Sequence, residues 1–583
     1  FMRMVNSRLA QHCEDQELLV DEQAGFREDR CCADQIFILT EVLAQKRQAN
    51  QKVSACFIDV RKAYDRVWRD GLWAALWEKG VRGKMWRVLR QYYQNVQSAV
   101  KTDGGVTEWF DVDVGVRQGC VISPLLFDVF VDRLAREVKR LGLGVAAGGG
   151  RLSLLLYADD IVVLAESQED LQKMMNAVHA FCKRWRLQVN MSKTKVMAFG
   201  SKGVANLDVR WGEEKIEEVE EYKYLGMWIE KRGSWKKEKE LKLRKARRAT
   251  ALAWNMATRG GDMSVRGATS MWTALIRPHL EYGAEVINNH NDFVWEEAEL
   301  LARKVGRRVL RCGVRLPNDA VLGELGWMTM RGRRMFLRLS YWGKVLEMGA
   351  GRWVKRVYEE GRARLETRAT ASTWCNLTKK WLMELGLREE WEAQETGPEW
   401  QETLRARIME LESRRWRRRV AHNIKLENYV RWKPKLELEE YLEHANARQR
   451  RLWTKLRGGC LELRVETGRW ERMSVGGQQV AVPRHLRYCK MCFREVEDSA
   501  HVFFRCPAYR TQRDALAEQV CKLATPGARK AMEGVRRRRR GEGRLVEEAC
   551  VMNWLMRGGG YVWGMEFLET AMAVRAFVLG EDR

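Results

Sequence analysis

Two short apolar runs flank a pair of adjacent acids near the end of the first third of the chain. Residues 152–165 read Leu-Ser-Leu-Leu-Leu-Tyr-Ala-Asp-Asp-Ile-Val-Val-Leu-Ala, so that Asp159 and Asp160 interrupt a hydrophobic stretch. Each run has the length of a buried strand, and a two-residue interruption predicts a tight β-hairpin. An ionised carboxylate at the edge of an apolar sheet loses hydration free energy unless a cation replaces the water. Two interpretations follow: a hairpin tip with two solvated aspartates, or a divalent metal site.

A second strand pattern covers Val53–Val60 and carries one acid near its end, Asp59. A helix-like run from Val67 to Trp77 follows it. A lone Asp that closes a strand is often a helix cap or a turn former. A strand that ends in Asp, followed much later by an Asp-Asp hairpin, is also what two-metal phosphoryl transfer needs, because two ions about 4 Å apart clamp the attacking and leaving oxygens.

Most of the remaining periodic stretches are helical. Residues 168–187 form an amphipathic pattern with a stripe of Leu171, Met174, Met175, Val178 and Phe181, which predicts a core-facing helix. From Trp235 to about Asn288 the pattern is helical and strongly basic at first. A run of charges is usually a solvated face, but a run of one sign also favours contact with phosphates.

The two acidic stretches resemble the palm of a reverse transcriptase. The Tyr-Ala-Asp-Asp box at 157–160 and the Phe-x-Asp-x-x-Lys-Ala-Tyr-Asp box at 57–65 are both characteristic of that family, and they are similar to those of non-LTR retrotransposons (long interspersed elements). The resemblance covers roughly residues 1–310. It implies an α+β fold: a right-hand polymerase with fingers and an antiparallel palm sheet, then a mostly α-helical thumb and a C-terminal region with a small zinc knuckle.

The same resemblance implies a metal site and its surroundings. Asp59, Val60, Asp159 and Asp160 would hold two Mg²⁺ ions. Lys193, in an Asn-x-x-Lys-Thr segment, would neutralise or protonate the leaving pyrophosphate; a plain surface lysine is the alternative.

Five further residues would contact the substrate. Arg27 and Arg30, beside a Gly-Phe-Arg segment, would meet the incoming triphosphate, because guanidinium groups bind phosphate bidentately. Tyr64 would be a steric gate against a ribose 2′-hydroxyl. Gln118 and Gly119, in Arg-Gln-Gly-x-x-x-Ser-Pro-x-Leu-Phe, would pack on the template–nucleotide pair. The plainer alternatives are a solvated loop, a core aromatic and a simple turn before a helix.

Composition favours a polyanionic partner. The chain has 583 residues, with 104 Lys and Arg against 78 acids, a formal net charge of +26 and a pI near 9.6. A soluble, arginine-rich protein is the alternative, but basic and aromatic residues cluster in several places. The sequence contains no run of about 18 apolar residues, so no membrane span is expected. The 14 cysteines, without a secretory signal, indicate an intracellular reducing compartment.

One cysteine-rich stretch predicts a further metal site. Cys489, Cys492, His501 and Cys506 have the spacing Cys-x2-Cys-x8-His-x4-Cys, which suits a closed structural zinc site. It is similar to the C-terminal motif of non-LTR elements. Unligated core cysteines are the alternative, and His485 is a competing ligand. Five consecutive arginines at 536–540 indicate a nucleic-acid tail or a nuclear-import signal.

A chain of this length exceeds one hydrophobic core, so several domains are expected. The predicted parts are as follows: partial fingers and palm, 1–232; helical thumb, 233–310; helical basic linker, 311–480; zinc knuckle, 481–515; helical basic tail, 516–583. The chain starts with Phe1 inside a helical pattern and lacks the family's first finger strands. We therefore expect missing upstream sequence, where any endonuclease would lie.

The resemblance as a whole implies an RNA-directed DNA polymerase that copies a retrotransposon RNA and is primed by a nicked DNA target. Its partners would be an RNA template, a DNA primer or target and dNTPs, in a ribonucleoprotein with the element's own RNA and with no membrane. It would act in the nucleus after a cytoplasmic stage. Two alternatives remain: a catalytically dead or domesticated fragment that binds RNA or DNA, and an RNA-templated RNA polymerase, which Tyr64 disfavours.

Overall fold

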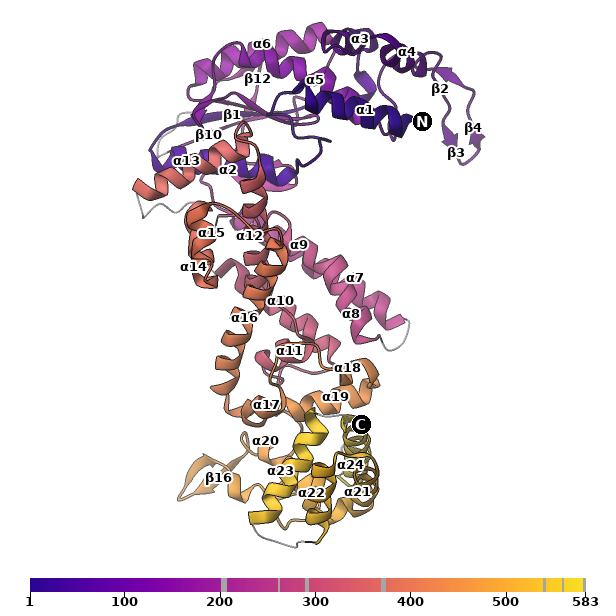
Figure 1. Cartoon of the computed structure of the whole chain (residues 1–583), viewed down its shortest axis with the longest axis vertical. Coiled ribbons are helices and arrows are strands. Elements are labelled where there is room, and N and C mark those ends of the chain that lie inside the picture. The colour runs from indigo at the N-terminus through magenta and orange to yellow at the C-terminus, as the bar shows by residue number, and fades with distance from the viewer. Residues whose placement is uncertain are drawn as a thin grey trace. The chain divides into compact units, whose positions relative to one another are not determined.

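The computed structural model describes residues 1–200, 207–259, 263–288, 293–367, 374–537, 542–557 and 560–579. They form two compact units, each assembled from separate stretches of the chain (Figure 1). The first unit contains Phe1–Leu241, Tyr282–Asn291 and Leu337–Gln401. The second contains Lys242–Glu281, Asp292–Phe336 and Glu402–Arg583.

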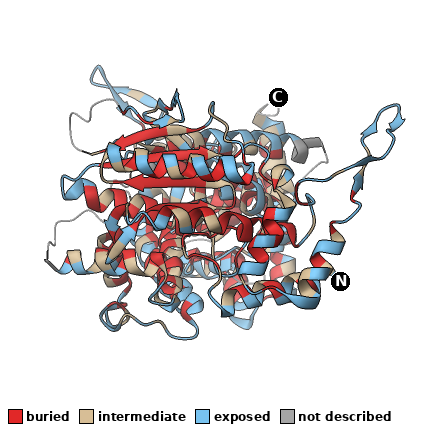
Figure 2. Ribbon diagram, turned by 90° about the horizontal axis from the view of Figure 1, so that it is seen from above, coloured by how far each residue is buried: buried red, intermediate tan, exposed pale blue. Residues whose placement is uncertain are grey.

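A five-stranded sheet lies at the centre of the first unit. Its strand order is β13-β10-β1-β9-β8, and its strands are β1 (Val53–Asp59), β8 (Leu154–Tyr157), β9 (Asp160–Ala165), β10 (Lys195–Phe199) and β13 (Glu217–Glu218). β1 is the middle strand and pairs antiparallel with both β9 and β10, while β8 and β9 form a hairpin. Strands β1, β8, β9 and β10 are mostly apolar and almost completely buried, because helices and a second hairpin cover both faces (Figure 2).

One face of this sheet packs against helix α6 (Gln168–Trp185). Helix α5 (Ser123–Lys139) packs on α6, and α3 (Arg69–Glu78) packs on α5. Alternate residues of β1, including Cys56 and Ile58, join the core on this side. In α6, the side chain of Ser167 caps the first turn by accepting a hydrogen bond from Asp170 N. The apolar stripe predicted for this helix is buried, as Leu171, Met174, Met175, Val178 and Phe181 all show.

The opposite face packs against α2 (Cys32–Gln48) and the hairpin of β14 (Glu221–Tyr224) and β15 (Met227–Glu230). Phe57 of β1 stacks on Tyr222 with ring centroids 4.3 Å apart. α2 is buried over most of its length because α13 (Trp353–Thr367) also packs on it. Its Phe37 contacts Tyr341 of α12 (Met330–Glu347) and Trp374 of α14 (Trp374–Leu385).

The rest of the first unit consists of short elements. An exposed arm is formed by β2 (Gln97–Ser98), β3 (Lys101–Thr102), β4 (Gly105–Val106) and β5 (Phe110–Asp111). The other elements are α1 (Met2–Asp15), η1 (Tyr64–Arg66), α4 (Gly83–Tyr92), β6 (Val145–Ala147), β7 (Gly150–Leu152), β11 (Arg210–Trp211), β12 (Glu214–Lys215) and α15 (Arg388–Ala393).

The second unit is mainly helical. It includes most of α7 (Lys236–Arg259) and of α16 (Trp400–Ala421), together with α8 (Val265–Met271), η2 (Trp272–Ile276), α9 (Arg277–Glu281), α10 (Phe293–Val309), α11 (Asn318–Leu325), η3 (Ile424–Leu426), α17 (Glu427–Trp432), α18 (Tyr441–His444), α19 (Ala447–Arg457), α20 (Arg464–Thr467), β16 (Arg472–Val475), β17 (Gln478–Ala481), η4 (Arg484–Leu486), η5 (His501–Arg505), η6 (Pro507–Tyr509), α21 (Arg510–Leu523), α22 (Pro526–Arg537), α23 (Glu542–Arg557) and α24 (Tyr561–Leu579).

A buried ion pair lies in the core of this unit. Arg457 Nε donates to Glu324 Oε1 at 2.9 Å, and neither side chain is exposed. Trp416, Trp453 and Tyr429 are buried in the same unit. Breaking a buried pair by removing one partner leaves an uncompensated charge, so both groups are needed for the packing of this core.

The architecture confirms the predicted α+β class, with a mainly antiparallel sheet early in the chain and helices dominating afterwards. Among the residues that the structure describes, every helix is too short or too polar to cross a bilayer. The predicted domain boundaries stay a prediction.

Candidate active site and metal-binding cluster

Three aspartates meet at one edge of the central sheet. Asp59 is the last residue of β1 and Asp160 is the first residue of β9, and the two are directly opposite each other in the antiparallel register. Opposite residues in such a pair have Cα atoms about 4.5–5.5 Å apart and side chains on the same face. Asp159 belongs to the turn that connects β8 to β9. The structure therefore brings together the acids that the sequence placed 100 residues apart.

Mutual repulsion and burial perturb these acids. Burial and the neighbouring carboxylates of Asp159 and Asp59 raise the pKa of Asp160 to about 6, and Lys193 offsets part of this rise. Burial also raises the pKa of Asp159, and the Asp59 carboxylate adds to that effect. A cation between the carboxylates would remove both penalties. Such an acid cluster fits a divalent ion better than it fits a solvated hairpin tip.

The turn that carries Asp159 is held from outside the hairpin. Ala158 has a φ of +56°, which a residue with a side chain adopts only at a cost of roughly 1–2 kcal/mol. The buried side chain of Gln23 stabilises the turn, since its Oε1 accepts hydrogen bonds from Ala158 N at 3.1 Å and Gly25 N at 2.9 Å. A Cβ on Gly25 would lie 2.5 Å from Ala158 N, so only glycine permits this approach.

Arg27 and Arg30 of this segment are buried and paired within the protein, whereas we expected them to face the incoming triphosphate. Arg27 donates to Glu14, Val20 O and Gln23 O, and only 4% of its side chain is exposed. Arg30 is paired with Asp21 at 2.6 Å and is similarly buried. A triphosphate contact by either guanidinium would require breaking these bonds. In this structure the two arginines instead stabilise the segment that supports the Asp159 turn.

A second segment, residues 188–194, closes around the end of β1. Asn190 N donates to Asp59 O at 2.8 Å and Arg61 N donates to Gln188 O at 2.7 Å, so Val60 and Val189 form an isolated bridge. The two hydrogen bonds of this bridge come from the flanking residues and leave the carbonyl of Val60 outside it.

Lys193 lies on the same segment. Its Nζ is 3.7 Å from Asp59 Oδ1, and its side chain is 66% exposed. The structure thus places Val60 and Lys193 next to the acids, as the sequence predicted. Their roles stay predictions.

Tyr64 lies beside the acids and is held by an aromatic stack. Its ring packs on Phe127 with centroids 5.1 Å apart, and its hydroxyl has no hydrogen-bond partner among the described residues. Burial raises the pKa of Tyr64, and the nearby carboxylates of Asp128 and Asp159 raise it further. The ring thus lies partly in the core and partly beside the site, and its role as a steric gate stays a prediction.

Gln118 and Gly119 lie on an exposed turn before α5. Gln118 Nε2 donates to Asp65 Oδ1 at 2.8 Å, which ties this turn to the box that contains Asp59 and Tyr64. Gly119 has a φ of +82° and open space on its Cβ side. A glycine here gives the left-handed turn without strain and leaves its backbone accessible.

One residue that our sequence reasoning did not assign to the site is Tyr222, on the β14–β15 hairpin. Burial raises the pKa of Tyr222, and the nearby charges of Asp160 and Asp59 raise it further. Its stacking on Phe57 fixes the β14–β15 hairpin against this edge of the sheet. The sequence signal was the alternation of Phe57 and Asp59, which puts both side chains on one face of β1.

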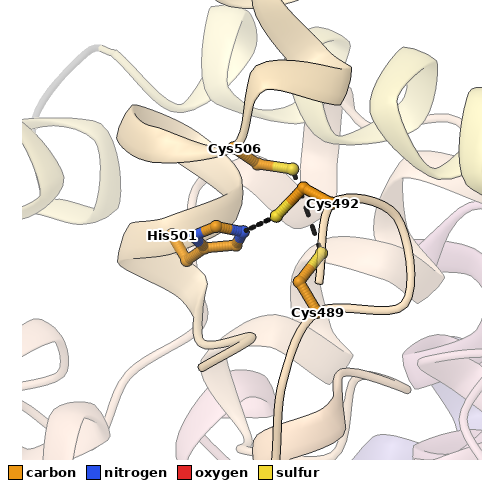
Figure 3. A group of neighbouring side chains, drawn as sticks. All are labelled: Cys489, Cys492, His501 and Cys506. Carbon is orange, nitrogen blue, oxygen red and sulfur yellow. Dashed lines mark hydrogen bonds between the residues drawn. The ribbon is translucent and has the colours of Figure 1, made fainter. Parts of the chain in front are cut away.

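The cysteine–histidine stretch forms a compact cluster in the second unit (Figure 3). One donor atom from each of Cys489, Cys492, His501 and Cys506 lies within 4.8 Å of all the others. Cys489 Sγ is 3.9 Å from Cys506 Sγ, and Cys492 Sγ is 3.3 Å from His501 Nε2. Ligands about 2.3 Å from a tetrahedral ion are separated by about 3.8 Å, so the cluster matches such a site closely. His485 lies outside it, on η4.

Buried contacts hold the cluster in its unit. Glu497, which is completely buried, accepts hydrogen bonds from Cys489 Sγ and Arg464 N and pairs with Arg575 of α24. Phe503 of η5 packs against Phe567 with centroids 4.6 Å apart. His501 Nδ1 lies 3.5 Å from Glu495 Oε2, an arrangement that orients a metal-binding imidazole.

The structure describes the basic part of α7 and the first two residues of the five-arginine run. On α7, the exposed positions include Arg244, Lys245, Arg247 and Arg248, whereas Lys242 is buried. Arg536 and Arg537 end α22, and residues 538–540 of the arginine run lie outside the described residues.

Comparison with known proteins agrees with the geometry of the acid site. Residues 1–229 match a family model described as reverse transcriptase (RNA-dependent DNA polymerase). A probable RNA-directed DNA polymerase from transposon BS of Drosophila melanogaster is 26% identical over 319 residues, which are 53% of this chain and 34% of that protein. A Pol polyprotein of a type-1 retrotransposable element R2 from Nasonia vitripennis is 28% identical over 206 residues, 35% of this chain and 19% of the relative.

The chain spans about a third or less of the length of these relatives. Among solved structures, apo telomerase from Candida tropicalis aligns with 69% of this chain and 61% of its own, with 14% identity and a TM-score of 0.36. A score that low carries no weight for the fold. The sequence match over residues 1–229 and the geometry of the acids remain the two relevant findings.

Proposed function

Because residues 1–229 are a reverse transcriptase domain, we propose that this protein is an RNA-directed DNA polymerase of a non-LTR retrotransposon. The observation that carries the proposal is the register of β1 against β9, which sets Asp59 opposite Asp160 and beside Asp159. A carboxylate cluster with raised pKa values at the end of a buried sheet is the arrangement that two divalent ions require. The register and the sequence match support the proposal independently.

The carboxylates of Asp59, Asp159 and Asp160 would hold two Mg²⁺ ions, with the carbonyl of Val60 as a further oxygen donor. Bound there, such ions would supply the positive charge that lowers the pKa of the primer 3′-hydroxyl and neutralises the triphosphate. Lys193, whose Nζ lies 3.7 Å from Asp59 Oδ1, would neutralise or protonate the leaving pyrophosphate. The Gln23–Ala158 hydrogen bond keeps Asp159 in position during this step.

Tyr64 and its stack on Phe127 would exclude the 2′-hydroxyl of a ribonucleotide by steric clash. The stack on Phe127 would hold the Tyr64 ring in position against a bound nucleotide, which steric exclusion requires. Gln118 and the accessible backbone at Gly119 would pack on the nascent base pair. These roles make the polymerase selective for dNTPs.

The cysteine–histidine cluster would bind one structural Zn²⁺. Three thiolates and an imidazole form a closed, four-coordinate donor set that suits zinc and leaves no position for a reactant. The ion would fix the chain between Cys489 and Cys506 against α24 through Glu497.

The partners would be an RNA template, a DNA primer or target and the element's own RNA in a ribonucleoprotein. A net charge of +26 supports binding of such polyanions. The nucleus, after a cytoplasmic ribonucleoprotein stage, is the proposed place of action.

Primer extension tests this proposal directly. The protein, an RNA template and an annealed DNA primer are incubated with Mg²⁺ and either dNTPs or NTPs. We expect extension with dNTPs alone. RNA binding without any extension would identify a dead or domesticated fragment, and extension with NTPs would identify an RNA polymerase.

A further inference from the structure

The chain returns to the first unit at Leu337–Gln401, after a stretch that belongs to the second unit. Within this return segment, α13 packs on α2, and one guanidinium joins the segment to two carboxylates. Arg352 Nε lies 3.2 Å from Asp21 Oδ1, and Arg352 Nη2 lies 3.3 Å from Asp34 Oδ2. A single arginine therefore connects the loop before α2 to the first turn of α2.

This network of one arginine and two acids is largely buried. The Asp34 side chain is only 2% exposed. The return segment supplies two further donors, because Tyr341 Oη donates to Asp34 Oδ1 at 2.9 Å and Trp353 N donates to Asp21 Oδ2 at 2.6 Å. Removal of Arg352 would leave Asp34 as a buried carboxylate with neutral donors alone among the residues described, which destabilises far more than the loss of an exposed pair.

Gln35, the residue after Asp34, holds β8 in place. Its buried side-chain amide donates to Glu22 O at 2.9 Å and to Leu156 O of β8 at 3.2 Å. Leu156 N in turn donates to Glu22 O at 2.9 Å, and Ala24 N donates to Leu156 O at 3.0 Å. The loop before α2 thus pairs in parallel with β8, and the amide from α2 closes this pairing.

Asp21 lies at the beginning of the same loop, two residues before Gln23. Gln23 Oε1 accepts the backbone hydrogen bond that holds the turn of Asp159. Arg352 therefore fixes both anchors of the pairing with β8: the loop through Asp21, and α2 through Asp34.

Helix α13 also holds the loop between β6 and β7, which precedes β8 in the chain. Arg356 Nε donates to Gly148 O at 2.8 Å, and Gly148 N donates to Glu360 Oε2 at 2.5 Å. A Cβ on Gly148 would lie 2.9 Å from Arg356 Cβ, so glycine permits this close approach. The return segment thus supports β8 both from the loop before α2 and from the loop before β8.

We propose that Arg352 is a positioning residue for the acid site and that the return segment is thereby a functional part of the polymerase. Arg352 holds the loop and α2 in the arrangement that sets the turn of Asp159. The inference rests on the proposed function for the reaction that this turn serves. A lysine cannot take over the role, because one ammonium group does not span two carboxylates as a guanidinium fork does.

Hydrogen exchange tests the positioning without relying on catalysis. In the full chain without Mg²⁺, Arg352→Ala should speed exchange of the Ala158 amide at least about threefold, because its hydrogen bond to Gln23 is weakened. The amides of α6 should exchange as in the unaltered protein, which excludes general unfolding. The matched control, Arg388→Ala, removes the same charge from a side chain of the return segment that is 73% exposed, and should change neither region.

Primer extension at several Mg²⁺ concentrations tests the functional consequence. Arg352→Ala should lower the rate about 10–100-fold and raise the half-saturating Mg²⁺ concentration about tenfold, since residues behind metal ligands set their orientation. Arg352→Lys should lie between this variant and the unaltered protein. A smaller folded fraction would lower the rate and leave the Mg²⁺ dependence unchanged, so the shift separates positioning from stability.

A double-mutant cycle tests the route through the turn. Gln23→Ala removes the hydrogen bond to Ala158 N directly. Arg352→Ala/Gln23→Ala should lose about as much activity as the worse single variant, because residues that act as a unit are not additive. Losses that multiply in the double variant would overturn the proposal.

Full activity of Arg352→Lys, or an unchanged Mg²⁺ dependence in Arg352→Ala, would also overturn it. If Arg352→Ala fails to fold, Arg352→Lys takes its place and should show smaller changes in the same direction. The two claims fail separately. Absence of primer extension by the unaltered protein refutes the polymerase, whereas normal exchange at Ala158 in the Arg352 variants refutes the positioning role.

Discussion

The acid site of the first unit and the cysteine–histidine cluster of the second are held in position by different means. Strand pairing on both sides of β1 fixes the three aspartates, and Gln23 and Asn190 brace the turn and the strand end from neighbouring loops. The cluster lies on short loops and one-turn elements with few regular hydrogen bonds. Backbone pairing can thus hold repelling charges together, whereas the short loops of the cluster depend on a few buried side-chain contacts and, on our proposal, on a bound metal.

Removal of zinc should show this difference most strongly. Structural zinc contributes about 10–16 kcal/mol of binding free energy to folding, so a thiol-competitive chelator should expose residues 488–506 and loosen α24. The sheet should remain folded. Hydrogen exchange measured region by region checks this. Unchanged protection around Cys489, or purified protein without zinc, would contradict the assignment.

Substitution of one acid should separate chemistry from folding. Asp160→Asn removes a metal-binding charge without changing the side-chain shape, and primer extension should fall at least about 10³-fold. Oligouridylate binding should stay within about twofold, because the acids contribute no phosphate contact of the kind that sets nucleic-acid affinity. A parallel loss of RNA binding would show that Asp160 is structural.

Steric crowding of the turn at Ala158 should reduce primer extension less than the loss of an acid does. Gly25→Ala places a Cβ 2.5 Å from Ala158 N, so the turn must shift, and misplacement of Asp159 should reduce extension by about 10–100-fold. Gly397→Ala, where nothing lies near the added Cβ, is the control. Equal rates for the two variants would mean that the Gly25 contact does not position the acids.

Opening the gate should change selectivity more than rate. Tyr64→Ala should raise ribonucleotide incorporation relative to dNTPs by about tenfold or more, because the clash with the 2′-hydroxyl disappears. Tyr64→Phe should behave like the unaltered protein, since the hydroxyl has no partner among the described residues. Unchanged sugar selectivity in Tyr64→Ala would return Tyr64 to a purely structural role.

The smallest effect concerns stability and pH. The pKa of Asp160 is raised to about 6 in the folded state, so the folded chain binds more protons than the unfolded chain between about pH 4 and 6, and stability falls as pH rises through that window. In Mg²⁺-free buffer without EDTA, the substitution Asp160→Asn should therefore raise the free energy of unfolding by about 1–2 kcal/mol at pH 8. At pH 4 it should change that free energy by almost nothing. Thermal melts at both values check this, and a gain that does not change with pH would contradict it.

Local pattern predicted much of the acid site, since its elements are two short strands and one hairpin. The alternation along Val53–Asp59 predicted the first strand, and the interruption at Asp159–Asp160 predicted the hairpin, because strand register follows burial. The turn itself lies one residue earlier, at Ala158–Asp159, because Asp160 already pairs with Tyr157. No sequence pattern predicted the burial of Arg27 and Arg30. Their partners Glu14 and Asp21 lie on adjacent segments whose fold back onto β8 depends on Gln23, and no periodicity signals that contact.

Spacing alone predicted the four metal ligands, because cysteine and histidine donors that share one ion must lie close in a short loop. The contacts of Arg352 were not predictable in the same way. Arg352, Asp21 and Asp34 come from separate stretches, and only tertiary packing brings them together. Net charge indicated a polyanion but gave no location for it.

Counting bound metal at the acid site tests the central claim most directly. Mn²⁺ substitutes for Mg²⁺ and is detected by electron paramagnetic resonance, here with primer–template and a non-hydrolysable dNTP present. The account predicts two Mn²⁺ ions per chain in the unaltered protein and a loss of tight binding in Asp59→Asn. Equal Mn²⁺ binding by both proteins would contradict the claim that Asp59, Asp159 and Asp160 hold the catalytic ions.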